Sequence, residues 1–214
     1  MGKIRVSNLL SFVLIIGVSI YGYMRFAELP ESVPTHFDLS GHPNGYSSRW
    51  FLMLFIPLLS LALQLLMPLF LKISPQGFKM EQSRDQLPII NLTIAGMMSC
   101  LQLGMLSAAT HGNAEPFPFY FGLAMSIILV GLGNVMGKIE PNFLIGIRLP
   151  WTLTSDQNWL ATHRFAGRSM VISGVILLIS NFIFASVPIA VGLLFVGTLS
   201  PVIYSYLFFR RHSH

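Results

Sequence analysis

A short segment near the start of the chain carries side chains that could bind a metal ion. His36, Asp38 and His42 lie close together in the sequence, and His111 lies much further along the chain. Imidazole and carboxylate groups are ligands that zinc accepts, and His111 could supply a fourth ligand. The His-x-Asp-x3-His spacing is not a common zinc spacing, however. We therefore expect turns and loop hydrogen bonds here and no cofactor, with a zinc site as the alternative.

A second candidate for chemistry is His163, which could exchange a proton with Asp156. No recognisable nucleophile motif accompanies this pair. The sequence therefore favours a protein that binds a ligand over an enzyme. A membrane enzyme that uses a metal held by the histidines of the first segment remains the enzymatic alternative.

The composition indicates that a lipid bilayer is part of the solvent of this chain. Hydrophobic residues make up 53% of the 214 residues, and charged residues only 10%, whereas a soluble domain has about a quarter charged residues. The net charge of +5 comes from short patches between apolar runs, which suits membrane orientation better than nucleic-acid binding. The single cysteine, Cys100, cannot form an intrachain disulfide.

Six apolar runs predict an all-α fold, a polytopic bundle of six transmembrane helices. A helix needs about 20 mostly apolar residues to cross the hydrocarbon core. A cleavable signal peptide is the alternative for the first run, but it has no clear small-residue cleavage site. Almost nothing joins the last two runs, so we expect a tight helical hairpin there. The predicted spans are 9–24, 50–71, 87–109, 117–136, 165–187 and 188–209.

The positions of Lys and Arg predict that both termini are cytoplasmic. In this orientation only Arg25 and Arg49 of the 13 positive residues lie outside. Such a bias is decisive under the positive-inside rule. The residues that lie inside are Lys3, Arg5, Lys72, Lys79, Arg84, Lys138, Arg148, Arg164, Arg168, Arg210 and Arg211.

The first outer loop, residues 25–49, should be a compact structure that binds an external ligand. Pro30, Pro34 and Pro43 exclude a regular helix. The strings Asp38-Leu-Ser-Gly41 and His42-Pro-Asn-Gly45 are two turn signals. The candidate ligand-binding residues of this loop are His36, Asp38, His42, Asn44 and Arg49.

The large inner loop, residues 137–164, is rich in aromatic residues and poor in acids. Thr154 and Gln157 fit a capping box, so a helix should begin near Ser155 and continue into the fifth span. Trp159 and His163 then share one face of this helix. Arg164 and Arg168 share another, which would face lipid phosphates or an acidic partner. The loop is either an interfacial anchor or a docking surface.

Long strings in the two loops resemble a known family. The string GNVMGKIEPNFLIGIRLPWTL from Gly133, followed by Trp159 and by THRFAG from Thr162, resembles the signature of SdpI-family bacterial immunity proteins. The string PTHF from Pro34, with Gly41, Gly45 and Ser48, resembles the small N-terminal domain that precedes this signature in the family. One departure is Gly137, where the family pattern has proline before the lysine.

The resemblance implies a multi-pass protein of the bacterial plasma membrane that protects a bacterium from a secreted toxic peptide. It also implies signalling, in which the toxin-bound protein holds a cytoplasmic repressor at the membrane. The partners would be the bilayer, the toxic peptide and the repressor, with no direct contact to nucleic acid. The inner-loop residues expected to bind the partner are Asn134, Lys138, Pro141, Asn142, Arg148, Pro150, Trp151, Thr152, Trp159, His163 and Arg164.

Two units follow from this resemblance. Residues 1–71 would form an N-terminal helical hairpin with the structured outer loop, and residues 72–214 an SdpI-like four-helix part with the inner loop. A transporter or flippase of a lipid or small amphiphile is the main alternative function. Polar side chains within the spans could line its cavity, although no charged residue lies in mid-span, which weighs against an ion-coupled pump: Gln64, Asn91, Gln102, Asn134 and Asn181.

The predicted topology can be tested by thiol labelling of intact cells. In a Cys100→Ser background, Ser40→Cys and His111→Cys should react with a membrane-impermeant thiol reagent, because both positions are predicted outside. Ser155→Cys should react only after the cells are lysed. Labelling of Ser155→Cys in intact cells would contradict the cytoplasmic placement of the inner loop.

Overall fold

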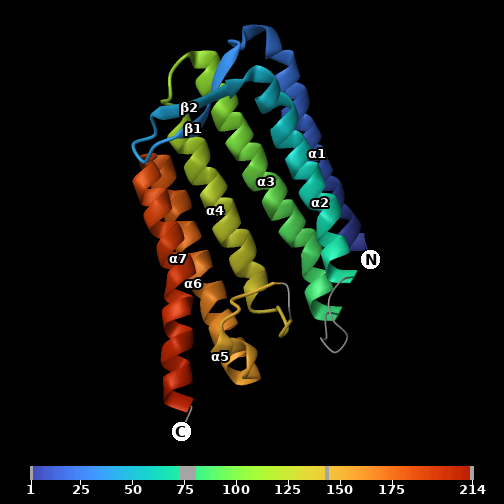
Figure 1. Ribbon diagram of the computed structural model, residues 1–214, viewed down its shortest axis with the longest axis vertical. Coiled ribbons are helices and arrows are strands. Elements are labelled where there is room, and N and C mark those ends of the chain that lie inside the picture. Colours follow the sequence, from blue (N-terminus) through green and yellow to red (C-terminus); the bar gives the residue numbers. More distant parts are fainter. Residues whose placement is uncertain (1, 73–80, 143–144, 213–214) are drawn as a thin grey trace.

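The computed structural model describes residues 2–72, 81–142 and 145–212 (Figure 1). Lys79, Phe143 and Leu144, which the sequence analysis used, lie outside the described residues. The chain is mostly helical, and its elements follow in the order α1 (Gly2–Met24), a short 3-10 helix (Phe26–Glu28), β1 (Ser32–Phe37), β2 (Pro43–Ser48), a π-helical segment (Phe51–Phe55), α2 (Ile56–Lys72), α3 (Glu81–His111), α4 (Phe117–Met136), α5 (Pro150–Leu153), α6 (Asp156–Ile183) and α7 (Val187–His212).

Five helices of the described chain, α1, α3, α4, α6 and α7, are long and apolar enough to cross a membrane. The protein is therefore a multi-pass membrane protein, as predicted. The second predicted span contains a shorter apolar helix, Phe51–Met67. Its first turns are π-helical and run directly into α2. The sixth crossing and the cytoplasmic position of the termini remain predictions.

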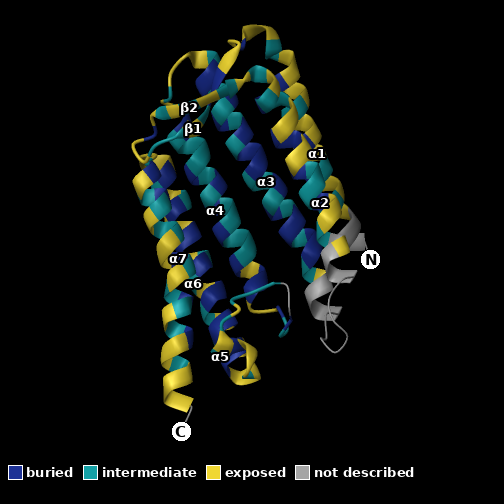
Figure 2. Ribbon diagram, in the orientation of Figure 1, coloured by how far each residue is buried: buried dark blue, intermediate teal, exposed yellow. Residues whose placement is uncertain are grey.

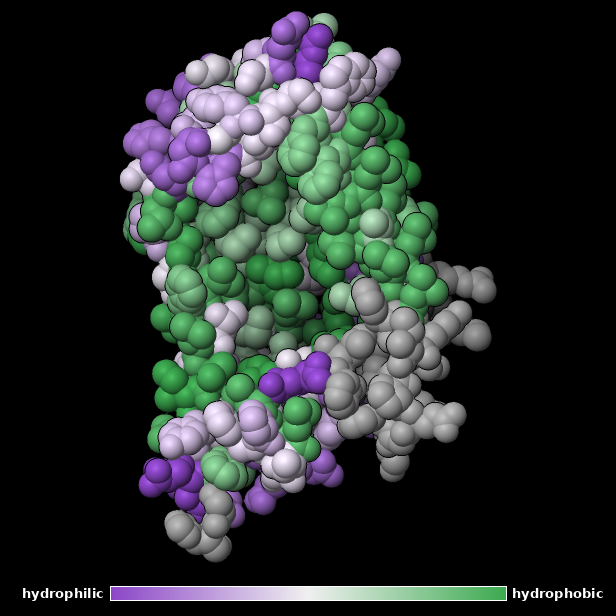
Figure 3. Space-filling model, in the orientation of Figure 1, coloured by the Kyte–Doolittle hydropathy of each residue, from purple (hydrophilic) through white to green (hydrophobic). Residues whose placement is uncertain are grey.

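The helices pack side by side in the order α1, α3, α4, α6 and α7, and α2 lies against α3. Among the five long helices α3 is the most buried, whereas α1 and α7 are the most exposed (Figure 2). Hydrophobic residues cover the middle of the face shown in Figure 3, and hydrophilic residues gather toward its two ends. This belt has the pattern expected of a surface in contact with lipid tails.

The two strands lie at one end of the bundle, called here the hairpin end (Figure 1). The signature loop, residues 137–155 with α5, lies at the opposite end, called the loop end, as does the C-terminus. The N-terminus also lies away from the hairpin. An even number of crossings would produce this arrangement.

The all-α prediction was wrong for the outer loop, where β1 and β2 form an antiparallel pair. The predicted turn at Asp38-Leu-Ser-Gly41 is confirmed, because Gly41 adopts a φ of 84° and its N–H donates to Asp38 O at 3.0 Å. The second predicted turn is wrong, since Pro43 to Gly45 lie in β2. The chain has already reversed at Gly41, so the following residues are free to pair with β1.

Glycines bring α4 and α6 into backbone contact. A Cβ atom on Gly133 would lie 3.0 Å from Gly167 O, and one on Gly167 would lie 2.9 Å from Gly133 O. A Cβ on Gly174 would lie 3.0 Å from Val130 N. Small residues at such positions allow helices to approach closely in lipid.

Amide side chains bridge helices. Gln64 Nε2 donates to Asn91 O at 2.8 Å, which joins α2 to α3. Asn181 Nδ2 donates to Phe119 O at 2.9 Å, which joins α6 to α4. These residues support helix packing, as expected for polar groups within a bilayer.

The helix predicted to run from the inner loop into the fifth span is confirmed as α6, so residues 156–164 belong to a helix. Its predicted cap was wrong by one residue. Ser155, not Thr154, is the N-cap, and its Oγ accepts the N–H of Asn158 at 3.2 Å. The Thr154 hydroxyl instead donates to Pro150 O at 3.0 Å, at the end of α5. The predicted tight connection is confirmed, since α6 ends at Ile183 and α7 begins at Val187.

Candidate functional site

The hairpin lies across the ends of the membrane helices. The ring of Phe37 stacks on that of Phe117 at the start of α4, with centroids 3.5 Å apart. A Cβ on Gly41 would lie 3.0 Å from Pro118 and 3.7 Å from Val187, the first residue of α7. The turn of the hairpin therefore touches the starts of both α4 and α7.

A cleft opens at each end of the bundle. The one at the hairpin end, called here the hairpin cleft, has a volume of about 510 Å³. Hairpin residues, among them His36 and Asp38, form one wall of this hairpin cleft. Apolar residues of α3, α4 and α7 form the other. A mostly apolar cleft with a few polar side chains on one wall suits an amphipathic ligand. The lining residues are Thr35, His36, Phe37, Asp38, Leu39, Leu101, Met105, Phe117, Phe121, Val187 and Val191.

Four of the five predicted ligand-binding residues form hydrogen-bonded pairs in the hairpin. His36 Nδ1 bonds to Asn44 Oδ1 across the strands. Asp38 Oδ1 accepts the backbone N–H of His42 at 2.9 Å, and its other carboxylate oxygen lies 3.9 Å from His42 Nδ1. His36, His42 and Asn44 are exposed. The turn thus holds polar groups at the mouth of the hairpin cleft.

Arg49, the fifth of these residues, lies at the base of the hairpin. Its Nη1 donates to Leu29 O at 3.2 Å, and its guanidinium carbon lies 4.6 Å from the centre of the Phe26 ring. Arg49 therefore ties the end of the hairpin to the segment that leaves α1. It does not line the hairpin cleft.

The described residues contain no group of three or more His, Cys, Asp or Glu side chains that could hold a metal ion. His111, the proposed fourth ligand, instead bonds through Nδ1 to Ser107 O at 2.8 Å at the end of α3. The zinc alternative therefore gains no support from the geometry of this part of the chain.

Two aromatic residues of α6 hold the signature loop in place. Trp159 Nε1 donates to Ile139 O at 2.9 Å. His163 Nε2 accepts the N–H of Ile147 at 2.9 Å, and its Nδ1 donates to Trp159 O at 2.8 Å. The two rings stack with centroids 4.0 Å apart, and both side chains are buried. Both nitrogens of His163 are engaged by backbone groups, so the ring has no free nitrogen for proton exchange with Asp156.

Gly146 packs directly against this pair. Its φ is 123°, and a Cβ at this position would overlap His163 Nε2 and lie 3.0 Å from the Trp159 ring. Only glycine combines this backbone conformation with so close an approach.

Asn142 and Thr152 complete the loop by bonding to its backbone. Asn142 Nδ2 donates to Glu140 O at 2.7 Å, and its Oδ1 accepts the N–H of Ile145 at 2.7 Å. The Thr152 hydroxyl accepts the N–H of Leu149 at 2.9 Å and donates to Ile147 O at 2.8 Å. Both side chains are buried. They supply hydrogen-bond partners to backbone N–H and C=O groups of the loop that would otherwise lack them.

The short helix α5 is fastened to α7 by Trp151. Its Nε1 donates to Ser205 Oγ at 3.0 Å, and its ring contacts those of Tyr206 and Phe209. Asn158 Nδ2 donates to Ser205 O at 3.2 Å from α6. The sequence analysis missed Ser205 and Asn158, because a serine in an apolar run carries no signal of a distant partner.

The residues predicted to bind a partner thus fall into two groups. Asn142, Thr152, Trp159 and His163 are buried and hold the signature loop, and Trp151 and Pro141 are half-buried. The exposed members lie at the surface of the loop end. Three of them, Asn134, Lys138 and Arg164, line a second cleft between α4 and α6. The other two, Arg148 and Pro150, lie in the signature loop.

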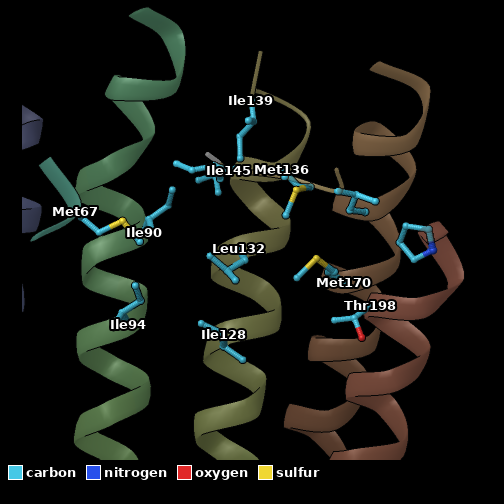
Figure 4. A pocket seen from close by; sticks show the side chains of 14 residues that line it. Met67, Ile90, Ile94, Ile128, Leu132, Met136, Ile139, Ile145, Met170 and Thr198 are labelled. Carbon is cyan, nitrogen blue, oxygen red and sulfur yellow. The ribbon is translucent and has the colours of Figure 1, made fainter. Parts of the chain in front are cut away.

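An apolar cavity of about 430 Å³ lies directly against the signature loop. Figure 4 shows Ile90 and Ile94 of α3 pointing toward Ile128 and Leu132 of α4. Loop residues close one end, and among the described lining residues only Thr198 carries a polar side chain. The lining residues are Met67, Ile90, Ile94, Ile128, Leu132, Val135, Met136, Ile139, Ile145, Gly146, Ile147, Met170, Thr198 and Pro201.

Two family models match the chain. Residues 138–205 match the SdpI/YfhL protein family, and residues 13–61 match a domain of unknown function, DUF1648. The immunity protein SdpI of Bacillus subtilis strain 168 is 26% identical over 175 residues, which cover 82% of this chain and 81% of that protein. No solved structure matches the chain. The first match spans most of the signature loop and its bonding partners on α6 and α7.

Replacement of Thr152 should loosen the signature loop. Thr152→Val keeps the shape of the side chain but leaves Leu149 N–H and Ile147 O without their partner. Such a loss costs about 1–3 kcal/mol, so limited proteolysis within residues 138–155 should be about tenfold faster. Thr154→Val is the matched control, because Thr154 is exposed. Equal cleavage of the two variants would contradict the assigned role of Thr152.

Proposed function

We propose that this chain, which matches the SdpI/YfhL protein family over residues 138–205, protects a bacterium from a secreted toxic peptide. The observation that carries the proposal is the family match over residues 138–205, which includes the residues that fold the signature loop. The curated relative that bears the name immunity protein spans 82% of this chain. The five long apolar helices agree with action at the plasma membrane.

The hairpin cleft is the proposed binding site for the peptide. A peptide that attacks membranes is amphipathic, with apolar residues that enter lipid and polar residues that stay in water. The hairpin cleft offers Phe117, Phe121 and Val191 on one side and His36 and Asp38 on the other. Capture there would hold the peptide at the membrane surface.

The proposal includes six crossings with cytoplasmic termini. The Lys and Arg bias supports this orientation. The helical segment from Phe51 through α2 supplies the second crossing. With this topology the hairpin faces outside, where a secreted peptide arrives, and the signature loop faces the cytoplasm.

A cytoplasmic repressor is the proposed partner of the signature loop. Arg148 and Pro150 are exposed there, and Arg is frequent at binding hot spots. Ile145 and Ile147, next to Arg148, line the apolar cavity. A change in how the helices pack around this cavity would therefore reach the exposed surface of the signature loop.

The peptide site can be tested by replacing the polar residues of the hairpin. Deletion of the gene should make its host sensitive to spent medium from wild-type cells. When expressed in the deletion strain, the triple variant His36→Ala, Asp38→Ala and His42→Ala should reach the membrane in normal amount. It should give little protection, even in metal-free medium. Tyr46→Ala, an exposed hairpin residue outside the hairpin cleft, should protect fully.

Two outcomes would count against the peptide site. Full protection by the triple variant would remove the hairpin cleft from the function. Stoichiometric zinc in the purified wild-type protein, lost in the triple variant, would favour the metal-dependent alternative.

The repressor site can be tested by comparing two loop variants in cells treated with spent medium. Arg148→Ala should keep membrane insertion and most protection but lose a co-purifying cytoplasmic DNA-binding protein. Trp151→Ala removes the bond to Ser205 and should lower protein amount, protection and recruitment together. If no cytoplasmic protein co-purifies specifically with the wild type, the signalling half of the proposal is wrong and protection remains.

A further inference from the structure

We propose that the cleft between α4 and α6 at the loop end binds the headgroup of an anionic phospholipid. This headgroup groove has a volume of about 480 Å³ and is separate from the hairpin cleft and the apolar cavity. Lipid binding at this cleft would require neither the peptide nor the repressor. Its lining residues are Gly133, Asn134, Gly137, Lys138, Arg164, Gly167, Arg168, Val171 and Ile172.

Glycines form the floor of the headgroup groove. Gly133 and Gly167 meet at the α4–α6 backbone contact described above, so these two positions add no side chain to the lining. Gly137 follows one turn later, and a Cβ there would be in ordinary contact with Arg164 at 3.8 Å. The headgroup groove is therefore open because of its sequence, and a bulky residue at Gly137 would fill it without a clash against the backbone.

Its rim is positively charged. Lys138 lies just past the end of α4, and Arg164 and Arg168 lie one turn apart on α6. All three are exposed, and none of the described residues that line the headgroup groove is acidic. Within the described residues, the two ion pairs found both lie at the hairpin end and involve none of these cations. An anion would therefore meet uncompensated positive charge, with the Asn134 amide as a further donor.

The shape of the ligand follows from what lies beyond the rim. Val171 and Ile172 line the part of the headgroup groove that faces the middle of the bundle. The exposed apolar surface continues along α6 through Val175, Ile176 and Ile179, which are 41%, 50% and 59% exposed. A free phosphate would use only the rim. A phospholipid would contact both the rim and the apolar surface, with its phosphate at the arginines and an acyl chain along α6.

The position in the membrane fits the same ligand. The cations lie where α6 passes from the polar loop end into its apolar stretch, which is the depth of lipid headgroups. Each Lys or Arg near the surface adds attraction to anionic lipid. The headgroup groove combines three such residues around one pocket, so it should select an anionic headgroup over a zwitterionic one.

The test measures binding of fluorescent phosphatidylglycerol and phosphatidylcholine to the purified full chain in detergent. Wild type should bind phosphatidylglycerol about tenfold more tightly. The double variant Arg164→Gln and Arg168→Gln should lose this preference. The matched control is Arg210→Gln and Arg211→Gln, which removes two exposed arginines from the end of α7 and should keep the preference.

A second variant tests the headgroup groove with all charges in place. Gly137→Leu should fill it and reduce phosphatidylglycerol binding, while elution in gel filtration stays that of the wild type. Equal binding of the two lipids by wild type would overturn the proposal. An equal loss in the two arginine pairs would mean general surface charge, and displacement by millimolar inorganic phosphate would mean a free-anion site. Each of these results rejects a phospholipid site.

Discussion

The contact between the backbones of α4 and α6 is the constraint on which the rest of the loop end depends. Lipid tails are as apolar as the helix surfaces, so helices in a bilayer gain most from close packing. Gly133 and Gly167 permit that packing because neither carries a Cβ. The contact fixes the two ends of the signature loop. It also separates the headgroup groove from the apolar cavity, to which neighbouring residues of α4 contribute.

Once its ends are fixed, the signature loop still needs hydrogen-bond partners for its backbone N–H and C=O groups. Near hydrocarbon, water is scarce and unpaired N–H and C=O groups are costly. Trp159, His163, Thr152 and Asn142 each direct a side chain to the backbone of this loop. Much of the long family string therefore encodes a fold rather than a contact surface. The exposed cations of the headgroup groove and Arg148 lie at the surface of the loop end.

Sequence patterns predicted the helices better than the loops. The fourth span was predicted at 117–136 and α4 occupies Phe117–Met136, because charged or turn-forming residues bound a clear apolar run. The hairpin was missed because Pro34 and Pro43 were used only to exclude a helix, and strands were not considered, although proline is tolerated in edge strands. The burial of His163 could not be predicted either, since it depends on the positive φ of Gly146 and on the fold of the loop over α6.

The two ends of the molecule are joined by the same helices. The hairpin touches α4 at Phe117 and Pro118 and α7 at Val187. The signature loop begins where α4 ends, and Trp151 fastens it to α7 at Ser205. A helix of 20 residues such as α4 spans about 30 Å. A ligand that displaced the hairpin would therefore act on the starts of α4 and α7, and the same two helices carry the anchors of the signature loop toward their other ends.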